Sequence, residues 1–321
     1  MYDSAESNNS FYRDLPELDM AQLAQRLKQQ VASRWTNGNC AILGCGYVGS
    51  ALAGYWQSQG HTVTGTTTRE DRVTSLSDLV SRVIVMKGSD ASAVQVLMEG
   101  QDTVVVSVAP IGSRVADEAT YAATYLETAQ NLLVALENAP TVKQLIYLSS
   151  SAVYGDRQGG WVDEEATIDP ADVRSQVLFQ AEQMLAQASN EHQKVCIFRL
   201  GGIYGPDREL WQMFGGMAGM VIPGKGDRIV NWIHLDDILG AIEFARLNKL
   251  EGIYNLVNDS VLSVKEQIDQ VCLEYGLPQP RWNPLLPSPQ RKSLRVSNQK
   301  LKAAGYQLIH PQLFAQRTGS A

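Results

Sequence analysis

The chain has few cysteines, and their spacing excludes the common metal and redox motifs. Its four cysteines form no C-x-x-C pair and have no histidine at ligand spacing. Three of them stand within apolar runs, as is typical of buried thiols. We therefore expect inert core cysteines, no metal site and a reducing, cytoplasmic location. The cysteines are Cys40, Cys45, Cys196 and Cys272.

Basic residues and long apolar runs are also scarce. Lys and Arg number 27 against 34 Asp and Glu, which gives a net charge of -7. The excess of acidic residues disfavours nucleic acid and anionic membranes as partners. The expected partner is a small-molecule substrate. No apolar run approaches the roughly 20 residues that span a bilayer. The polar, acidic start, Met1–Asp19, is unlike a signal peptide.

What remains is the pattern of an α/β protein. From Cys40 onward, short apolar runs alternate with longer helical patterns. Uninterrupted apolar runs are typical of strands buried on both faces, and the alternation predicts a doubly wound parallel sheet. The expected strands are Ala41–Leu43, Thr62–Thr67, Arg82–Met86, Thr103–Val108, Gln144–Leu148 and Val195–Leu200, and the main helices between them are Gly49–Gln59, Ala116–Asn138 and Pro170–Asn190.

A glycine-rich turn follows the first apolar run. Gly44, Gly46 and Gly49 complete a G-x-G-x-x-G pattern, in which they provide the tight turn, the backbone approach to a pyrophosphate and close helix–strand packing. The helix that opens at Tyr47 and Val48 directs its amides and positive dipole end at the phosphates. Because a strand precedes and a helix follows, we predict a dinucleotide site; a glycine turn without a ligand is the alternative.

The end of the second strand indicates which dinucleotide binds. NAD sites usually place Asp or Glu there, whereas Arg accommodates the 2′-phosphate of NADP. This chain has Thr67, Thr68 and Arg69, and its first acid is Glu70. NADP is therefore favoured and NAD is the alternative. Arg69 has a second interpretation, a solvated side chain paired with Glu70 or Asp71.

The chain divides into three parts by composition. Residues 1–35 predict a partly disordered extension, 36–200 a Rossmann-type NAD(P)-binding domain, and 201–321 the segments of a small substrate lobe, with about 230–257 returning to the Rossmann core. A capping box, Ser263–Glu266, opens one late helix. The predicted cofactor site also includes Ala109, Pro110, Ser149, Gly201 and Ile203.

An ordered series of further motifs supports a family resemblance. The motifs are Ser149–Gly155, Phe198–Pro206, Ile233–Asp237 and Ile253–Asn255. With the glycine loop, they resemble the extended short-chain dehydrogenase/reductase superfamily, which includes nucleotide-sugar epimerases and dehydratases. The resemblance runs from about Cys40 to His310. It implies an NAD(P)-dependent oxidoreductase or epimerase-like enzyme for a small polar, for example sugar-derived, substrate, and a homodimer is compatible with it.

The catalytic motif departs from that family. Ser150 matches the family's Ser or Thr that hydrogen-bonds the reacting oxygen. Aligning Glu182 with the Glu that follows the family's Y-x-x-x-K motif places Arg174 at the Tyr position and Leu178 at the Lys position. Arginine keeps its proton near neutral pH, and leucine offers no charge. The chain thus looks like an atypical member, with both residues expected on a wall of the cleft.

Other titratable groups give weaker catalytic candidates. The resemblance assigns the V-Y-G tyrosine, Tyr154, mainly to structure, although it is the second candidate proton donor. His234 would lie at the lobe junction as a structural residue, and His61, His192 and His310 read as strand-start or surface residues. Two hypotheses remain: an atypical enzyme that recruits another proton donor, and a dinucleotide-binding sensor or regulator without turnover.

Overall fold

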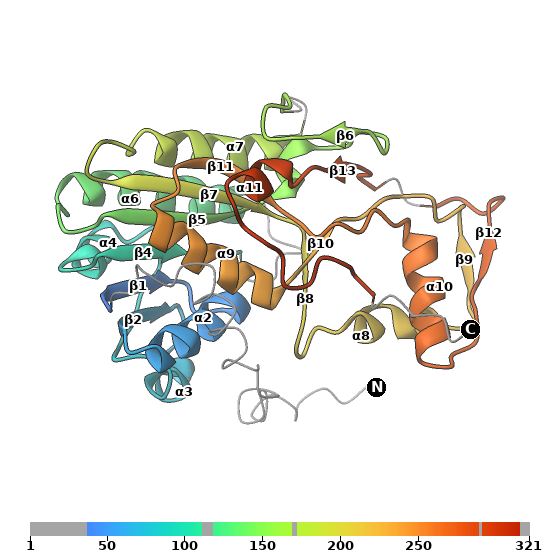
Figure 1. Ribbon diagram of the computed structural model, residues 1–321, viewed down its shortest axis with the longest axis horizontal. Helices are drawn as coiled ribbons and strands as arrows, with labels where there is room; N and C mark the ends of the chain where they lie inside the picture. The colour runs from blue at the N-terminus through green and yellow to red at the C-terminus, as the bar shows by residue number, and fades with distance from the viewer. Residues whose placement is uncertain (1–36, 111–117, 169–171, 289–290, 315–321) are drawn as a thin grey trace.

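A computed structural model describes residues 37–110, 118–168, 172–288 and 291–314. Its centre is a seven-stranded parallel sheet with the strand order β11-β7-β5-β4-β1-β2-β3 (Figure 1). The extension predicted for residues 1–35 lies outside the described residues. The strands are β1 (Asn39–Leu43), β2 (Thr62–Thr67), β3 (Arg82–Val85), β4 (Thr103–Val106), β5 (Gln144–Ser150), β7 (Lys194–Leu200) and β11 (Gly252–Leu256).

Helices cover both faces of this sheet. On one face α2 (Tyr47–Ser58) packs beside α9 (Leu235–Asn248). On the other, α4 (Ala91–Met98), α6 (Thr128–Glu137) and α7 (Val173–Ala186) pack in sequence. Apolar clusters fill both layers, so the predicted doubly wound architecture is confirmed. Shorter helices are η1 (Glu70–Arg72), α3 (Val73–Ser77), α5 (Glu118–Ala122), η2 (Ala123–Glu127) and η3 (Ser151–Tyr154).

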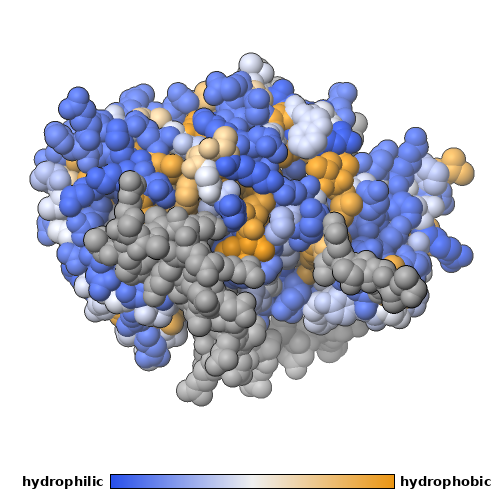
Figure 2. Space-filling model, in the orientation of Figure 1, coloured by the Kyte–Doolittle hydropathy of each residue, from blue (hydrophilic) through white to orange (hydrophobic). Residues whose placement is uncertain are grey.

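The remaining elements form a smaller lobe beyond one edge of the main body (Figure 1). Short parallel pairs join β8 (Gly202–Tyr204) to β10 (Trp232–His234), β9 (Val221–Pro223) to β12 (Arg281–Asn283) and β6 (Trp161–Val162) to β13 (Arg295–Val296). The helices here are α8 (Leu210–Phe214), η4 (Gly215–Met217) and α10 (Val264–Glu274), whereas α11 (Gln299–Ala303) packs against β11 of the main sheet. Figure 2 shows a mainly hydrophilic face, with apolar residues gathered near its middle.

In the C-terminal part, one sequence prediction is confirmed and another differs from the structure. The capping box is present, because Ser263 and Glu266 exchange hydrogen bonds at the start of α10. The return to the main core is longer than the expected stretch of about 230–257, since Leu301 and Tyr306 are buried in the cluster beneath α2 and α9. This late segment is too short for an amphipathic pattern in the sequence to reveal that contact.

The thiols behave as expected. All four cysteines are free and buried. Burial raises the pKa of Cys45, inside the glycine-rich turn, to about 11, so this thiol remains protonated and unreactive near neutral pH. Within the described part of the chain, no helix has both the length and the apolarity to cross a membrane.

Candidate dinucleotide and substrate site

Most predicted site residues gather at one edge of the sheet. The strands are parallel, so their carboxyl ends share an edge, and β7, β5, β4, β1 and β2 are successive neighbours there. The glycine loop follows β1, Thr68 and Arg69 follow β2, Ala109 and Pro110 follow β4, Ser150 ends β5, and Gly201 follows β7. Residues as far apart in the sequence as Gly44 and Gly201 therefore share one edge.

The three glycines of the loop have different structural requirements. Gly44 has φ +101°, and a Cβ there would lie 2.5 Å from the carbonyl oxygen of Ser107. A Cβ on Gly49 would lie 2.2 Å from the carbonyl oxygen of Gly44. A Cβ on Gly46, by contrast, would have no heavy atom within 4 Å. The fold thus requires Gly44 and Gly49, whereas the bare backbone at Gly46 faces open space.

The start of α2 has neither a capping side chain nor an acidic residue in its first turn. Gly46 is the N-cap residue and offers no side chain to the amides of the first turn, which also contains no acidic residue. Val48 is buried, while the Tyr47 hydroxyl donates to the carbonyl oxygen of Pro206 at 2.7 Å. The Arg208 guanidinium lies 4.2 Å from the centre of the Tyr47 ring. Tyr47 therefore links the loop to the chain that enters the lobe.

The end of β2 contains two arginines near this loop. The Arg69 side chain is exposed and pairs with Asp71, as the second interpretation of this residue expected. Thr67 is buried, and its hydroxyl accepts a hydrogen bond from the Arg69 amide at 3.2 Å. Arg72, which the sequence analysis did not select, donates to the carbonyl oxygen of Cys45 at 2.6 Å. The sequence could have suggested Arg72 as a second candidate, because it stands three residues after Arg69.

The two serines that end β5 have opposite environments, as alternating side chains of a strand do. Ser149 is buried, and its hydroxyl donates to Glu182 at 2.6 Å. Ser150 is half-buried, and its Oγ accepts a hydrogen bond from the Ala152 amide at 3.1 Å. Since a hydroxyl has a donor hydrogen as well, Ser150 retains the ability to donate to a substrate oxygen.

A buried polar network supports this strand end. Glu182 and Arg199 form an ion pair of 2.7 Å with side chains that are 0% and 2% exposed. Arg199 also donates to the Tyr154 hydroxyl, which in turn donates to Asn255 at 2.6 Å. Burial raises the pKa of Tyr154 despite these bonds. The hydroxyl of Tyr154 is committed within the interior, and this position supports a structural role over catalysis.

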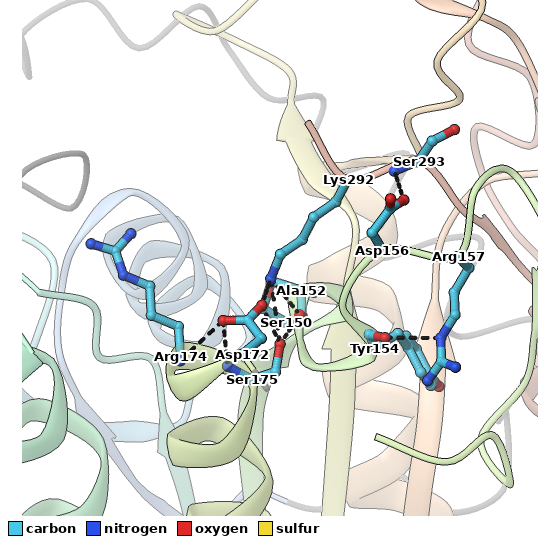
Figure 3. Close-up of polar contacts among 10 residues, drawn as sticks. All are labelled: Ser150, Ala152, Tyr154, Asp156, Arg157, Asp172, Arg174, Ser175, Lys292 and Ser293. Atoms are coloured by element: carbon cyan, nitrogen blue, oxygen red, sulfur yellow. Dashed lines mark hydrogen bonds and ion pairs between the residues drawn. The ribbon is translucent and has the colours of Figure 1, made fainter. Parts of the chain in front are cut away.

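Arg174 and Leu178 are one helical turn apart on α7, but they do not share a cleft wall. Arg174 is exposed, points away from Ser150 and lies with its guanidinium 5.5 Å from the centre of the Tyr121 ring (Figure 3). Leu178 is only 1% exposed and packs with Val153 and Val257. The expectation that Leu178 lines the cleft is wrong, because the inner face of α7 closes an apolar cluster at this point.

A lysine from the lobe lies beside Ser150 instead. Lys292, between β12 and β13, pairs with Asp172, the N-cap residue of α7 (Figure 3). Its Nζ is also 3.4 Å from both the Ala152 carbonyl oxygen and Ser175 Oγ. Burial by itself raises the pKa of Asp172, but the bonds from Lys292 and Ser175 outweigh it and lower that pKa. No local sequence signal links Lys292 to α7, which is 120 residues earlier.

The histidines form a separate cluster at the lobe junction. His234 is the N-cap of α9, where its Nδ1 accepts from the Asp236 amide at 3.1 Å. His310 stacks on His234 with 3.8 Å between ring centres, and its Nε2 lies 2.8 Å from Asp236 Oδ2. Burial by itself raises the pKa of Asp236, but its hydrogen bonds with the two rings outweigh burial, so this pKa lies below its ordinary value. These three side chains could surround a metal, but their hydrogen bonds already hold the junction together.

The other predicted residues lie close to the same edge. Ala109 is exposed and Pro110 is buried, and both follow β4. Gly201 and Ile203 are half-buried. A Cβ on Gly201 would lie 2.8 Å from the carbonyl oxygen of Asn231, so packing alone requires this glycine.

The sequence pattern of the NAD dependent epimerase/dehydratase family matches residues 40–256, which contain the glycine loop, both β5 serines and the β7 and β11 strands. The chain belongs to the NAD-dependent epimerase/dehydratase family. This membership confirms the superfamily resemblance that the motifs predicted. Protein YeeZ of Escherichia coli (strain K12) is 30% identical over 268 residues, covering 81% of this chain and 93% of that protein.

Solved structures share this fold at lower identity. A UDP-N-acetylglucosamine 4-epimerase from Methanobrevibacter ruminantium M1, in complex with UDP-N-acetylmuramic acid, has a TM-score of 0.71 at 16% identity, with 85% of this chain and 94% of that one covered. MoeE5 in complex with UDP-glucuronic acid and NAD has a TM-score of 0.67 at 19% identity, with 83% and 92% covered. These likenesses show the shared fold.

Proposed function

We propose that the chain is an atypical NAD(P)-dependent oxidoreductase or epimerase-like enzyme for a small, polar, sugar-derived substrate. The observation that carries the proposal is the pairing of an open phosphate-binding loop at Gly46 with a half-buried Ser150 on the same sheet edge. Family members with known structures bind UDP-sugars, and one is bound to NAD. A cytoplasmic enzyme and a homodimer fit the same proposal.

The chain's residues suggest how the dinucleotide would be held. The loop residues Gly44–Gly49 would surround the pyrophosphate, with the amides of Tyr47 and Val48 as donors. Ser149, whose hydroxyl bonds to Glu182, would contact the cofactor through its backbone. The nicotinamide supplies hydride exchange when bound, while Ser150 would donate to the reacting oxygen. Ala109, Pro110, Gly201 and Ile203 are proposed to line the remainder of the dinucleotide site.

The test is turnover of sugar nucleotides. UDP-glucose, UDP-N-acetylglucosamine and UDP-glucuronic acid are incubated with NAD or NADP, and the reduced nicotinamide absorbance and the epimers, resolved by NMR, are measured. Ser150→Ala is expected to lower kcat by about 10²- to 10³-fold, the usual effect of losing one donor to a reacting oxygen. Ser151→Ala is the neighbouring control. Equal rates for Ser150→Ala and wild type would contradict the role of Ser150.

A dinucleotide-binding sensor without turnover is the second candidate. It is favoured by the burial of Leu178 and by the orientation of Arg174 away from Ser150, because α7 then supplies neither member of the family's proton-transfer pair. Tight dinucleotide binding by calorimetry, combined with no turnover of the three sugar nucleotides, would select this candidate over the enzyme.

We propose NADP as the preferred cofactor, with NAD as the alternative. Thr67 and Thr68 provide no carboxylate for a ribose 2′-hydroxyl, and two guanidinium groups lie beside the strand end. Arg72 contacts the glycine loop directly, whereas Arg69 pairs with Asp71. Arg72 is therefore the better-placed partner for a 2′-phosphate, and Arg69 is the second.

Replacing these arginines should separate the two cofactors. Arg72→Ala is expected to weaken NADPH binding by about 10- to 100-fold, the loss of one charge-assisted interaction of about 1.5–3 kcal/mol. NADH affinity should change little and thus reports the integrity of the loop. Arg69→Ala should act in the same direction with a smaller effect. Calorimetry with both dinucleotides decides; parallel losses, or tighter NADH binding by wild type, would contradict the NADP preference.

A further inference from the structure

An ammonium group from the lobe, that of Lys292, contacts the N-cap residue of α7, the helix that was aligned with the family's Y-x-x-x-K motif. The inference drawn from it rests on the proposed function, because it concerns the same substrate oxygen. In the first two turns of α7, Arg174 turns outward and Leu178 is buried. Lys292 enters from the opposite side, along the segment between β12 and β13 (Figure 3).

The contacts of Lys292 place it next to Ser150. Ser175 Oγ lies 2.8 Å from both the Ala152 carbonyl oxygen and Asp172 Oδ2, either of which can accept its one hydroxyl proton. Lys292 Nζ joins this group through Asp172, Ser175 and the Ala152 carbonyl oxygen. The amide of that same Ala152 donates to Ser150 Oγ at 3.1 Å. One residue, Ala152, thus separates the ammonium from the serine hydroxyl that is proposed to hold the substrate oxygen.

The backbone beside Lys292 is fixed, while its ammonium remains accessible. The Ser293 amide donates to Asp156 at 2.9 Å, and Ser293 Oγ accepts from the Ile229 amide at 3.0 Å. The side chain of Lys292 is 41% exposed, against 23% for Asp172. The ammonium is therefore aimed by the fold but retains a route to water, from which a proton can be replaced.

We propose that Lys292 is the catalytic acid of this enzyme, and that Asp172 is its positioning residue. Like the phenol that the family uses, a lysine ammonium is a weak acid whose proton an alkoxide, a much stronger base, accepts. Both groups are therefore suited to protonate a forming alkoxide. Lysine has three donor hydrogens, so Nζ can keep its bond to Asp172 and exchange one of its two 3.4 Å contacts for a substrate oxygen.

The step balances in the direction of ketone reduction. A bound reduced nicotinamide dinucleotide would supply the hydride, with its electron pair, that bonds to the carbonyl carbon of the keto-sugar. The π pair of the carbonyl moves to oxygen, which bonds to a proton from Lys292 Nζ while Ser150 donates a hydrogen bond. The products are the alcohol, the oxidised dinucleotide and a neutral amine that regains its proton from water. The reverse sequence oxidises the alcohol.

The experiment combines substitution with chemical rescue. Lys292→Ala is expected to lower kcat with the UDP-sugar probes by about 10²- to 10⁴-fold, the usual contribution of a general acid. Dinucleotide affinity should be unchanged. Lys194→Ala is the matched control, because Lys194 also pairs with an acid, Glu251 at 2.8 Å, at the amino end of β7. Circular dichroism confirms that each variant is folded.

Rescue distinguishes a proton donor from a fixed charge. Added methylammonium should restore turnover of Lys292→Ala, whereas tetramethylammonium, which carries charge without a transferable proton, should not. Restoration by both, or by neither, overturns the acid role and leaves Lys292 as a structural or electrostatic contact. Full activity of Lys292→Ala also overturns it.

Binding separates this result from failure of the proposed function. UDP-glucose affinity is measured by calorimetry for wild type and for Lys292→Ala in the presence of the dinucleotide. A wild type that neither binds nor turns over any probe overturns both the sugar-nucleotide function and the role of Lys292. A wild type that turns over a probe, together with an unaffected Lys292→Ala, overturns the role of Lys292 alone.

Discussion

Gly46→Val is expected to leave the fold intact and to lower dinucleotide affinity by about a hundredfold or more, or about 2.8 kcal/mol. The fold should tolerate the side chain because a Cβ at Gly46 meets no heavy atom within 4 Å, and the residue's φ of -80° is accessible to valine. The same open space is where the pyrophosphate must approach the backbone. Calorimetry with NADPH and NADH, together with the thermal unfolding midpoint, measures both effects.

Gly49→Ala is the matched contrast to this variant. Its Cβ would lie 2.2 Å from the Gly44 carbonyl oxygen, a backbone atom that cannot rotate away. We expect this smaller substitution to destabilise the protein, unlike the larger one at Gly46. Unchanged dinucleotide affinity in Gly46→Val would show that the loop does not bind a pyrophosphate, and unfolding of that variant would show that the open space is needed by the fold.

Arg199→Met is expected to lower the free energy of unfolding by about 3–5 kcal/mol, the range for breaking a buried ion pair. Glu182 is 0% exposed, so loss of its partner leaves a carboxylate in the interior with only Ser149 to donate to it among the hydrogen bonds described. Burial by itself lowers the pKa of Arg199, but its bonds to Glu182 outweigh burial and raise that pKa, so the guanidinium keeps its charge. Urea denaturation followed by circular dichroism measures the change.

The double variant Arg199→Met with Glu182→Met provides the control. Removing both charges leaves no buried unpaired carboxylate, and replacing a buried ion pair with apolar groups is often close to neutral in stability. We therefore expect the double variant to be more stable than Arg199→Met alone. A loss below about 1 kcal/mol in the single variant, the value typical of exposed pairs, would show that water reaches the network.

The strands and the phosphate loop were predictable because their signals are local. Thr62–Thr67 forms β2 with the predicted bounds, and the apolar run from Gln144 continues as β5 to Ser150. A strand buried on both faces needs an uninterrupted apolar run, and a tight strand–helix turn needs glycine at Gly44, so each feature is written in adjacent residues. The capping box of Ser263 and Glu266 is equally local.

The catalytic surroundings were only partly predictable. The resemblance selected Ser150, and the structure places it half-buried at the sheet edge. It also assigned Leu178 to the cleft. The burial of Leu178 depends on which face of α7 packs against the cluster around Val153, and the helical pattern of the sequence does not indicate that face. Lys292 had no signal, since lysines on an irregular segment are usually solvated side chains.

By itself, the sequence determined the parallel α/β architecture and the glycine loop that follows its first strand. Only the tertiary structure decided that Arg72 contacts the loop, that Tyr154 belongs to the Glu182–Arg199 network and that Lys292 contacts the Ala152 carbonyl oxygen. Strand and turn signals are read from neighbours along the chain. Contacts between residues over a hundred positions apart depend on packing of the lobe against the sheet edge, which fixes both distance and direction.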